Sequence, residues 1–320
     1  MDQAEIVSLE ELIKKDHVYR KVSELFPEAQ IKRSLEGLEQ AKGADGYGII
    51  RLFKCLFLQF FEDLSDRELA RFLQENTAAK WFCGFTLSEK TPTFTLFGKI
   101  RSKIGTSRLS KLFGLVREAL QSQGYMNEVF TFIDASHLIA KASLWKERDE
   151  VIKKKYEKLN NQTLPKVAKD PEARIGSKGK DKFWYGYKKH VSVDMSSGLI
   201  NKVAITPANE SDGQGLKRVC PRSGVIYADK GYCGKGARQD ASSKGASLHA
   251  IKKNNMKAKD KRLDRYITGL RAPFEGVFSQ DNKRVRYKGV VKNQFAAFMQ
   301  AMVFNLKRLV RINEPLACTA

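Results

Sequence analysis

The second half of the chain contains five strand-type segments, and their order restricts the sheets that it can form. The first three are VFTFIDAS (129–136), FWYGYKKHVSVD (183–194) and LINKVAITP (199–207), which are rich in β-branched and aromatic residues. GVIYAD (224–229) and SLHAIKK (247–253) follow stretches that can form helices. We therefore expect an antiparallel meander from the first three segments. The last two require crossovers, so we expect them to run parallel to the first.

The part of the chain before residue 126 has the apolar spacing of helices. SDRE places Ser65 as an N-cap and Glu68 three residues later, which is a capping box. TPTF offers Thr91 as a second N-cap with Pro92 at the first helical position. We expect an all-α domain over residues 1–125. One interpretation includes a helix-turn-helix-like unit, and the other is a plain helical bundle.

A long polar segment, residues 141–182, separates the first two strand-type segments. Its first part can form a charged helix, and KDPEARIGSKGKDK has the composition of a basic loop. Such a segment is either a DNA-contact element or a mobile insertion. We expect a second domain over residues 126–312 that carries this insertion, followed by a tail over residues 313–320.

The charge of the chain favours a polyanionic partner. Lys and Arg number 58 against 36 Asp and Glu, which gives a formal net charge of +22 and a pI near 9.7. An excess of this size indicates nucleic acid, although a solvated basic surface, a ribosome-associated protein or a membrane-surface protein would share it.

Zinc-binding, disulfide-stabilised and membrane-spanning classes are disfavoured. The five cysteines form no CxxC pair, and the four histidines lack ligand spacing. The N-terminus lacks the order of a signal peptide. The most apolar run, IIRLFKCLFLQFF (49–61), is too short to span a bilayer and includes Arg51 and Lys54. We expect a soluble protein of the cytoplasm without a membrane partner.

Two aspartates end apolar runs. Asp134 follows the first strand-type run, and Asp229 follows the fourth. On adjacent parallel strands both carboxylates would leave the sheet at one edge, where they repel each other unless they share divalent cations. Aspartate after a strand is also common turn chemistry, which suffices for Asp194 before the MSSG hairpin. For the pair in a basic chain we favour a metal site that acts on phosphodiesters.

A third carboxylate is expected from the C-terminal part. If Pro273 occupies the first helical position, Glu275 is the third helical residue, and Ala272 at the N-cap has no oxygen with which to complete a capping box. Stabilisation of an acidic residue by the helix dipole is the alternative explanation. The nearby cations are suited to positioning phosphate: Arg271, Lys283, Arg284 and Arg286.

Together, the segments FIDAS, WYGYKKHVSVD, TPANESD, ADKGY and RAPFE…K…RYKG resemble bacterial insertion-sequence transposases of the DDE class, insertion-sequence-five type. The resemblance covers residues 45–310. It implies a ribonuclease H-like α/β fold, with a mixed five-stranded sheet flanked by helices and preceded by an all-α N-terminal domain. It implies a catalytic triad that binds two Mg²⁺ ions, which Mn²⁺ can replace: Asp134, Asp229 and Glu275.

Arg271 matches the arginine of the family's Tyr-Arg-Glu-Lys signature. The signature tyrosine falls at Thr268, with Tyr266 nearby, and the lysine falls at Asn282, with Lys283 one place beyond. Lys230, which follows Asp229, is expected to contact phosphate. The other expected DNA contacts are Arg271, Lys283, Arg284, Arg286, Lys182 and Lys188.

The resemblance implies a DNA transposase that moves an insertion sequence by cut-and-paste, through metal-dependent end cleavage and strand transfer. The implied partners are transposon-end inverted repeats, target DNA and a second copy of the chain, in the bacterial nucleoid. Two alternatives are a ribonuclease H-like nuclease or resolvase without strand transfer, and a non-catalytic DNA-binding repressor derived from a transposase. A nucleotide-binding enzyme is disfavoured because neither GxGxxG nor GxxxxGK[ST] follows a strand.

Overall fold

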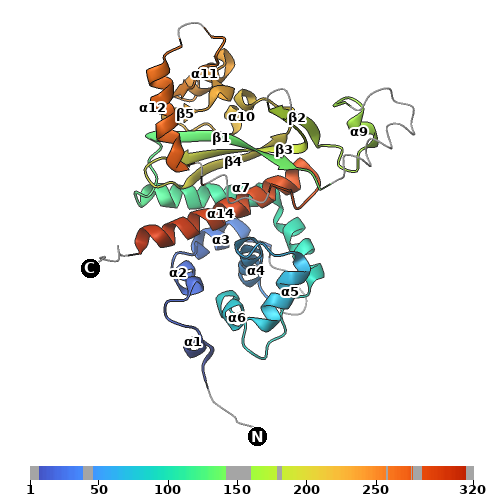
Figure 1. Ribbon diagram of the computed structural model, residues 1–320. Coiled ribbons are helices and arrows are strands. Elements are labelled where there is room, and N and C mark those ends of the chain that lie inside the picture. The colour runs from blue at the N-terminus through green and yellow to red at the C-terminus, as the bar shows by residue number, and fades with distance from the viewer. Residues whose placement is uncertain are drawn as a thin grey trace. The chain divides into compact units, whose positions relative to one another are not determined.

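A computed structural model describes residues 7–38, 46–141, 160–178, 182–256, 259–274, 276 and 283–314. The chain divides into two compact units. The helical unit joins residues 1–116 to residues 298–320, and the sheet unit comprises residues 117–297. Figure 1 labels their elements.

The helical unit is organised around one apolar helix, α4 (Ile49–Phe61), which has 10 buried residues among its 13. The most apolar run of the sequence is therefore a core helix. The ring of its Phe57 packs against the rings of Phe26 and Phe82. No helix in the described ranges combines the length and apolar character needed to cross a bilayer. The other helices of this unit are α1 (Leu9–Leu12), α2 (Val18–Glu24), α3 (Glu28–Leu35), α5 (Asp66–Glu75), α6 (Thr77–Cys83) and parts of α7 (Phe94–Ser122) and α14 (Val290–Asn313).

Helix starts were predicted with mixed success. The capping box is confirmed, because Ser65 accepts from the Glu68 backbone and the Glu68 side chain accepts from the backbone of Ser65. The predicted start at Thr91 and Pro92 is wrong. Helix α7 begins at Phe94, and the Thr91 side chain is buried at 7% exposure. At Gly105 the backbone turns to φ 68, which breaks α7 into two helical parts.

The described residues of the sheet unit form six strands: β1 (Phe130–Ile139), β2 (Arg174–Lys178), β3 (Lys182–Asp194), β4 (Ile200–Pro207), β5 (Gly224–Ala228) and β6 (Ala246–Ala250). Its shorter elements are α9 (Leu164–Val167), α10 (Asp212–Val219), the 3₁₀ turn η1 (Lys230–Tyr232), α11 (Lys235–Ser242), α12 (Lys261–Arg271) and the 3₁₀ turn η2 (Ala272–Phe274).

The strand order is β2-β3-β1-β5-β6, and β4 also pairs with β3. Strand β3 is antiparallel to β1, β2 and β4, whereas β5 and β6 run parallel to β1. The predicted meander and the two parallel crossovers are therefore confirmed, as is a mixed sheet flanked by helices, although the sheet has six strands where five were predicted. Strand β2 is an addition, because part of the predicted basic loop pairs with Lys182–Gly186. Most of the predicted charged helix, residues 142–159, lies outside the described residues.

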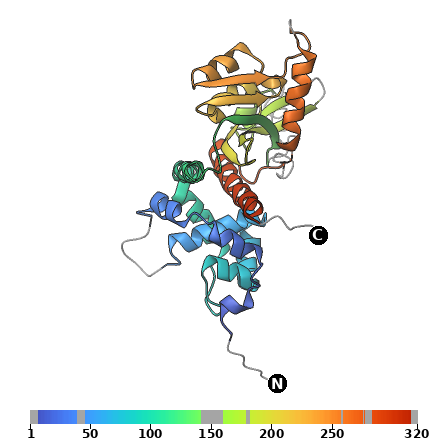
Figure 2. The ribbon, with the colours of Figure 1, turned by 90° about the vertical axis from the view of Figure 1, so that its left-hand side faces the viewer.

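Alternate residues of β1 face different helices, as expected for a strand. Ile133 packs with residues of α10 and α11, including Leu216 and Ala237. Phe132 instead lies against Phe274 and under the guanidinium of Arg271. Helices α10 and α11 therefore cover one face of the sheet, and α12 covers the other (Figure 2).

Asp194 has the turn role that the sequence predicted. It is 0% exposed, and its carboxylate accepts backbone N–H groups from Ser196 and Ser197 after the strand and from Asn127 and Glu128 before β1. Burial opposes ionisation, yet hydrogen bonds from Ser196, Ser197 and Asn127 hold the pKa of Asp194 below its usual value. The Asp194 carboxylate therefore ties the turn between β3 and β4 to the residues just before β1.

We expect Asp194→Ala to lower the free energy of unfolding by about 2–4 kcal/mol at pH 7, because it leaves buried N–H groups unpaired. The lowered pKa means that this stabilisation is present above the unfolded pKa near 3.9 and is lost as pH falls through the folded value. Urea denaturation at pH 7 and pH 3 measures both effects. The exposed Asp16→Ala is the control, and an equal loss in the two variants would contradict this role.

Candidate active site

Strand pairing brings Asp134 and Asp229 to one edge of the sheet. Strands β1 and β5 are adjacent and parallel, with Ile133 opposite Ala228 in the register. Asp134 is the next residue of β1, and Asp229 is the first residue after β5. The strand adjacency on which the sequence interpretation depended is therefore confirmed, and both carboxylates occupy equivalent places on neighbouring strands.

Arg271, the last residue of α12, lies between the two carboxylates. One terminal nitrogen is 3.4 Å from Asp134 Oδ2, and the other is 3.3 Å from Asp229 Oδ1. The guanidinium lies over the Phe132 ring, 5.3 Å from its centroid, and the Arg271 side chain is only 11% exposed. A single planar cation thus reaches both acids, so their oxygens converge on a small volume.

Backbone groups hold the two carboxylates in place. Ala135 N–H donates to Asp134 at 2.8 Å, and Lys230 N–H donates to Asp229 at 2.7 Å. Burial raises the pKa of Asp134 to about 6, against the opposing effects of the Ala135 N–H and Arg271, and the Asp229 carboxylate raises it further. The ionised form of Asp134 is therefore costly without added positive charge.

The two aspartates fit a divalent cation. They offer carboxylate oxygens, which Mg²⁺ prefers, and they already converge on one positive group. Within the described ranges, no group of three or more His, Cys, Asp or Glu side chains is placed to hold a metal ion. Glu275, the predicted third ligand, lies outside the described residues.

Pro273 does not occupy the predicted first position of an α-helix. It lies in the 3₁₀ turn η2, which directly follows α12 (Lys261–Arg271). Asp260 caps α12, since its side chain accepts the backbone N–H groups of Arg262 and Leu263. Arg271 is the last residue of that helix.

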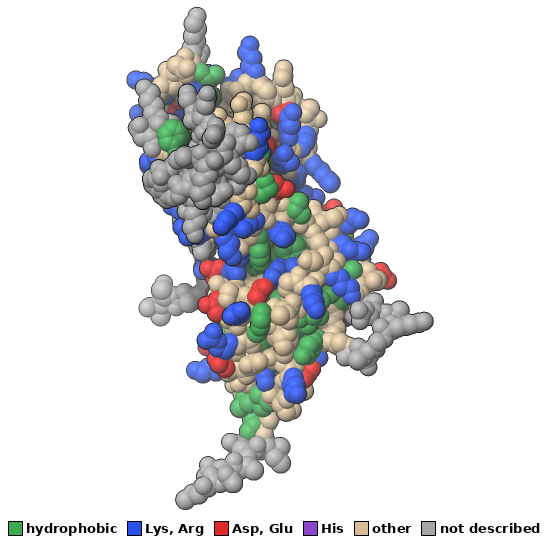
Figure 3. Space-filling view, turned by 90° about the vertical axis from the view of Figure 1, so that its right-hand side faces the viewer, with side chains coloured by type: hydrophobic (Ala, Val, Ile, Leu, Met, Phe, Trp, Pro, Cys, Tyr) green, Lys and Arg blue, Asp and Glu red, His purple; other side chains and the backbone are tan. Residues whose placement is uncertain are grey.

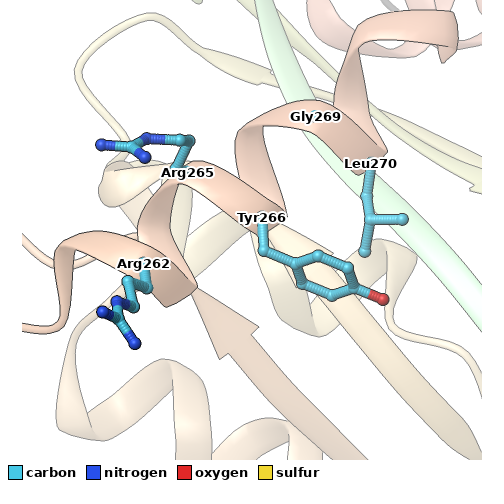
Figure 4. A pocket seen from close by; sticks show the side chains of 5 residues that line it. All are labelled: Arg262, Arg265, Tyr266, Gly269 and Leu270. Atoms are coloured by element: carbon cyan, nitrogen blue, oxygen red, sulfur yellow. The ribbon is translucent and has the colours of Figure 1, made fainter.

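The outer side of α12 carries a pocket of about 390 Å³ (Figure 4). It is lined by Arg262, Arg265, Tyr266, Gly269 and Leu270, and Tyr266 is 60% exposed. This surface offers two cations and an aromatic ring on the same helix that delivers Arg271 to the aspartates. Tyr266 lies near the predicted place of the signature tyrosine, whereas no local pattern singled out Arg262 or Arg265.

Asp212 was not predicted as a site residue, because its segment, SDGQGLKRV (211–219), was interpreted only as a possible helix. It opens α10 and pairs with Lys188, with 2.8 Å between Asp212 Oδ1 and Lys188 Nζ. A Cβ at position 231 would lie 2.5 Å from Asp212 Oδ2, so a side chain there would displace this carboxylate. Tyr232 is buried nearby, and its pKa is raised by burial and then by Asp212, Asp134 and Asp229.

Several predicted DNA-contact cations gather beyond Asp134 at the end of β1. Lys283 O accepts from Ile139 N–H at 2.7 Å, and Arg284 bridges to Ile139. Lys182 pairs with Lys178 across the β2–β3 hairpin. The pKa of the neighbouring His137 is lowered by burial and then by Lys283, Lys178 and Lys182.

Of the other predicted contacts, Lys188 lies opposite His137 in the β1–β3 register, and Arg286 is close to the end of β1. Lys230 is exposed beside Asp229, whereas Lys188 is engaged by Asp212. Arg286 follows Val285, whose N–H donates to Ile139 O at 2.9 Å.

Comparison with known families identifies the chain. Residues 130–306, more than half of its length, match the family model described as Transposase DDE domain. The chain belongs to the DDE transposase family. Residues 7–103 also match a model described as Transposase domain (DUF772). The prediction of a DNA transposase of the DDE class is thus confirmed, and this transposase carries both models in one chain.

Two solved structures with some similarity are also transposases. The piggyBac transposase synaptic complex with hairpin DNA has 9% sequence identity, covers 96% of this chain and 76% of that chain, and gives a TM-score of 0.39. The Mos1 transposase paired-end complex with left transposon end has 7% identity, with coverages of 89% and 86% and a TM-score of 0.17. These scores are low, and the identification rests on the family models.

We expect Asp134→Asn to stabilise the metal-free transposase at pH 7.5 by about 1–2 kcal/mol. The folded pKa of about 6 exceeds the unfolded value of about 3.9, so the wild type loses stability as pH rises through this range. Asparagine cannot ionise, so the variant does not lose stability over this pH range. Urea midpoints in a chelator should differ at pH 7.5 and agree at pH 4, and equal midpoints at both pH values would contradict the burial of this carboxylate.

Proposed function

We propose that this transposase cleaves DNA at transposon ends and joins the freed 3′-hydroxyl to target DNA, with Asp134 and Asp229 as the centre of its catalytic site. One observation carries the proposal. Two carboxylates at one edge of the sheet lie within 3.4 Å and 3.3 Å of a single guanidinium. Two carboxylates on neighbouring strands repel each other unless a cation lies between them, so a site that binds cations explains their convergence better than turn chemistry does.

We infer that Asp134, Asp229 and Glu275 hold divalent metal, with Mg²⁺ as two ions and Mn²⁺ as a substitute. Such ions lower the pKa of a water nucleophile and stabilise the leaving oxygen of a phosphodiester. The donor set supports this choice, because Mg²⁺ binds carboxylates together with substrate phosphate oxygens. The same site would then serve hydrolysis at the transposon end and strand transfer by the 3′-hydroxyl.

The residues around the carboxylates keep them oriented. The N–H groups of Ala135 and Lys230 each fix one carboxylate oxygen, which limits the reorganisation required during reaction. Arg271 would bind a DNA phosphate when it exchanges its carboxylate partners, because a guanidinium suits both anions. Exposed Lys230 is placed for a second phosphate contact.

We further propose that the basic segments beyond β1 guide the DNA strand towards Asp134. Lys182 and Lys283 support this role because both lie near His137, three residues after Asp134. Arg284, Arg286 and Lys188 remain predicted contacts, although the Lys188 ammonium group already pairs with Asp212. Figure 3 shows Lys and Arg side chains spread over the visible face, which is consistent with non-specific attraction to phosphate.

The proposed partners are transposon-end inverted repeats, target DNA and a second copy of the chain in a synaptic complex. The region 1–125 is proposed to bind the ends, and the region 126–312 to perform the chemistry. We place this activity in the bacterial cytoplasm at the nucleoid.

Asp229→Ala and Glu275→Ala should each reduce cleavage of transposon-end DNA by about 10³-fold, equivalent to about 4 kcal/mol. A gel assay of labelled end duplexes with Mg²⁺ measures the nick, and labelled target DNA measures joining. Asp240→Ala, at an acidic residue of α11, is the control. Full activity in either variant would refute the catalytic assignment, and cleavage without joining would indicate a nuclease.

Adding Mn²⁺ should raise the melting temperature of the wild type, because a ligand at 100 times its Kd stabilises the folded state by about 2.7 kcal/mol. The Asp134→Asn/Asp229→Asn double variant should show no such rise, since asparagine lacks the charge that binds the ion. Thermal unfolding without DNA provides this readout. An equal rise in both proteins would place the metal elsewhere.

A further inference from the structure

The first part of α7, from Phe94 to the break at Gly105, has two different sides. Phe97, Ile100 and Ile104 are buried, with exposures of 0%, 7% and 1%. On the opposite side the exposed residues recur at helical spacing and are all polar: Thr95, Lys99, Ser102 and Lys103. The buried side explains why this segment is helical, and its polar side needs a separate explanation.

The charge of this segment has one sign. No Asp or Glu occurs between Glu89 and Glu118, whereas the interval contains seven cations: Lys90, Lys99, Arg101, Lys103, Arg108, Lys111 and Arg117. Nearby acids are already paired, since Glu89 binds Arg51 at 2.6 Å and Asp66 binds Arg101 at 2.5 Å. The outer face therefore presents positive charge to the solvent.

The helix is held firmly by its inner side. Arg101 binds both oxygens of Asp66 on α5, at 2.7 and 2.5 Å, and also the side chain of Gln59 on α4, at 3.1 Å. Gln59 is 1% exposed, so this link reaches into the core of the helical unit. A bidentate clamp of this kind fixes the direction in which the outer face points.

The start of the helix adds an exposed aromatic residue and a further cation beside it. Phe94 is 42% exposed and lies under Arg67 of α5, whose guanidinium carbon is 5.0 Å from the ring centroid. At Gly98 a Cβ would meet only the end of the Arg101 side chain, at 3.8 Å. Small hydroxyl residues near a glycine leave the backbone accessible, and Lys99 and Lys103 lie on the same face.

We propose that the outer face of Phe94–Ile104 enters the major groove of duplex DNA. A helix with side chains is about 10–12 Å across, which matches the groove width of about 12 Å. Lys99, Lys103 and Arg67 contact phosphates, while Thr95 and Ser102 contact base edges. The inference rests on the proposed function, because it assigns recognition of the transposon end to this face.

The structure also distinguishes this helix from its neighbours. Helices α5 and α6 meet at Asn76, which ends one and caps the other, and this close junction resembles a helix-turn-helix unit. Yet Ala79, Phe82 and Cys83 of α6 are buried, which leaves α6 little surface for DNA. The reading helix is therefore the first part of α7.

The test uses the full-length transposase in a chelator, so that binding is measured without cleavage. Fluorescence anisotropy compares duplexes of about 30 bp, roughly three helical turns, taken from the inverted repeat flanking the gene or shuffled in sequence. Lys99→Ala/Lys103→Ala should weaken binding to both duplexes at least 10-fold and reduce the salt slope by about 2. The control is Lys15→Ala/Lys32→Ala, which removes two exposed lysines from the same unit.

Thr95→Ala/Ser102→Ala tests the base contacts separately. This pair should lower the preference for the end duplex over the shuffled duplex about 10-fold and leave the salt slope unchanged. All four positions are exposed, so melting temperatures should match the wild type. Lys99→Gln/Lys103→Gln repeats the charge test with a longer side chain if the alanine pair is unstable.

Binding by the lysine variant equal to that of the control pair would overturn the inference. If the wild type still cleaves ends in that case, the proposed function survives and only this face is excluded. If the lysine variant loses binding but the wild type cleaves no end with Mg²⁺, the face is supported and the proposed chemistry fails. Loss of self-association with unchanged DNA binding would assign the face to a protein partner instead.

Discussion

The position of Arg271 between Asp134 and Asp229 is the interaction on which the site depends. Two carboxylates on adjacent parallel strands repel each other, and the guanidinium at 3.4 and 3.3 Å offsets that repulsion. The guanidinium lies over the Phe132 ring, and it is supplied by the last residue of α12, which follows β6 in the chain. The arrangement keeps the acids together at the cost of a raised pKa for Asp134, which a divalent cation would relieve.

The other strands and helices of the sheet unit fix the sheet edge that carries Asp134 and Asp229. Strand β3 joins β1 to β2 and β4, so the meander fixes the position of β1. The crossover through α10 then places β5 beside β1 in parallel, with Asp212 packed against Gly231 just beyond Asp229. In the helical unit, the Arg101–Asp66 clamp has a comparable role, because it fixes the helix that we propose for DNA recognition.

Particular elements explain where prediction from sequence succeeded and failed. The strands around Asp134 and Asp229 were found because apolar, β-branched runs end in a polar residue, and the parallel pairing followed from crossover lengths. The Thr91 start failed because α7 begins only at Phe94 and Thr91 is buried. The Pro273 start failed because this residue lies in the 3₁₀ turn after α12, where the fixed φ of proline is equally acceptable. Strand β2 was missed because the polar segment RIGSK becomes a strand only through pairing with β3.

The sequence by itself determined the order of strands and helices, the excess of positive charge and the two aspartates at strand ends. These depend on local composition, which each segment carries regardless of its neighbours. Only the tertiary structure decided that Arg271 lies between those aspartates and that Lys188 is engaged by Asp212. Such contacts join residues far apart in the chain, so no local pattern encodes them.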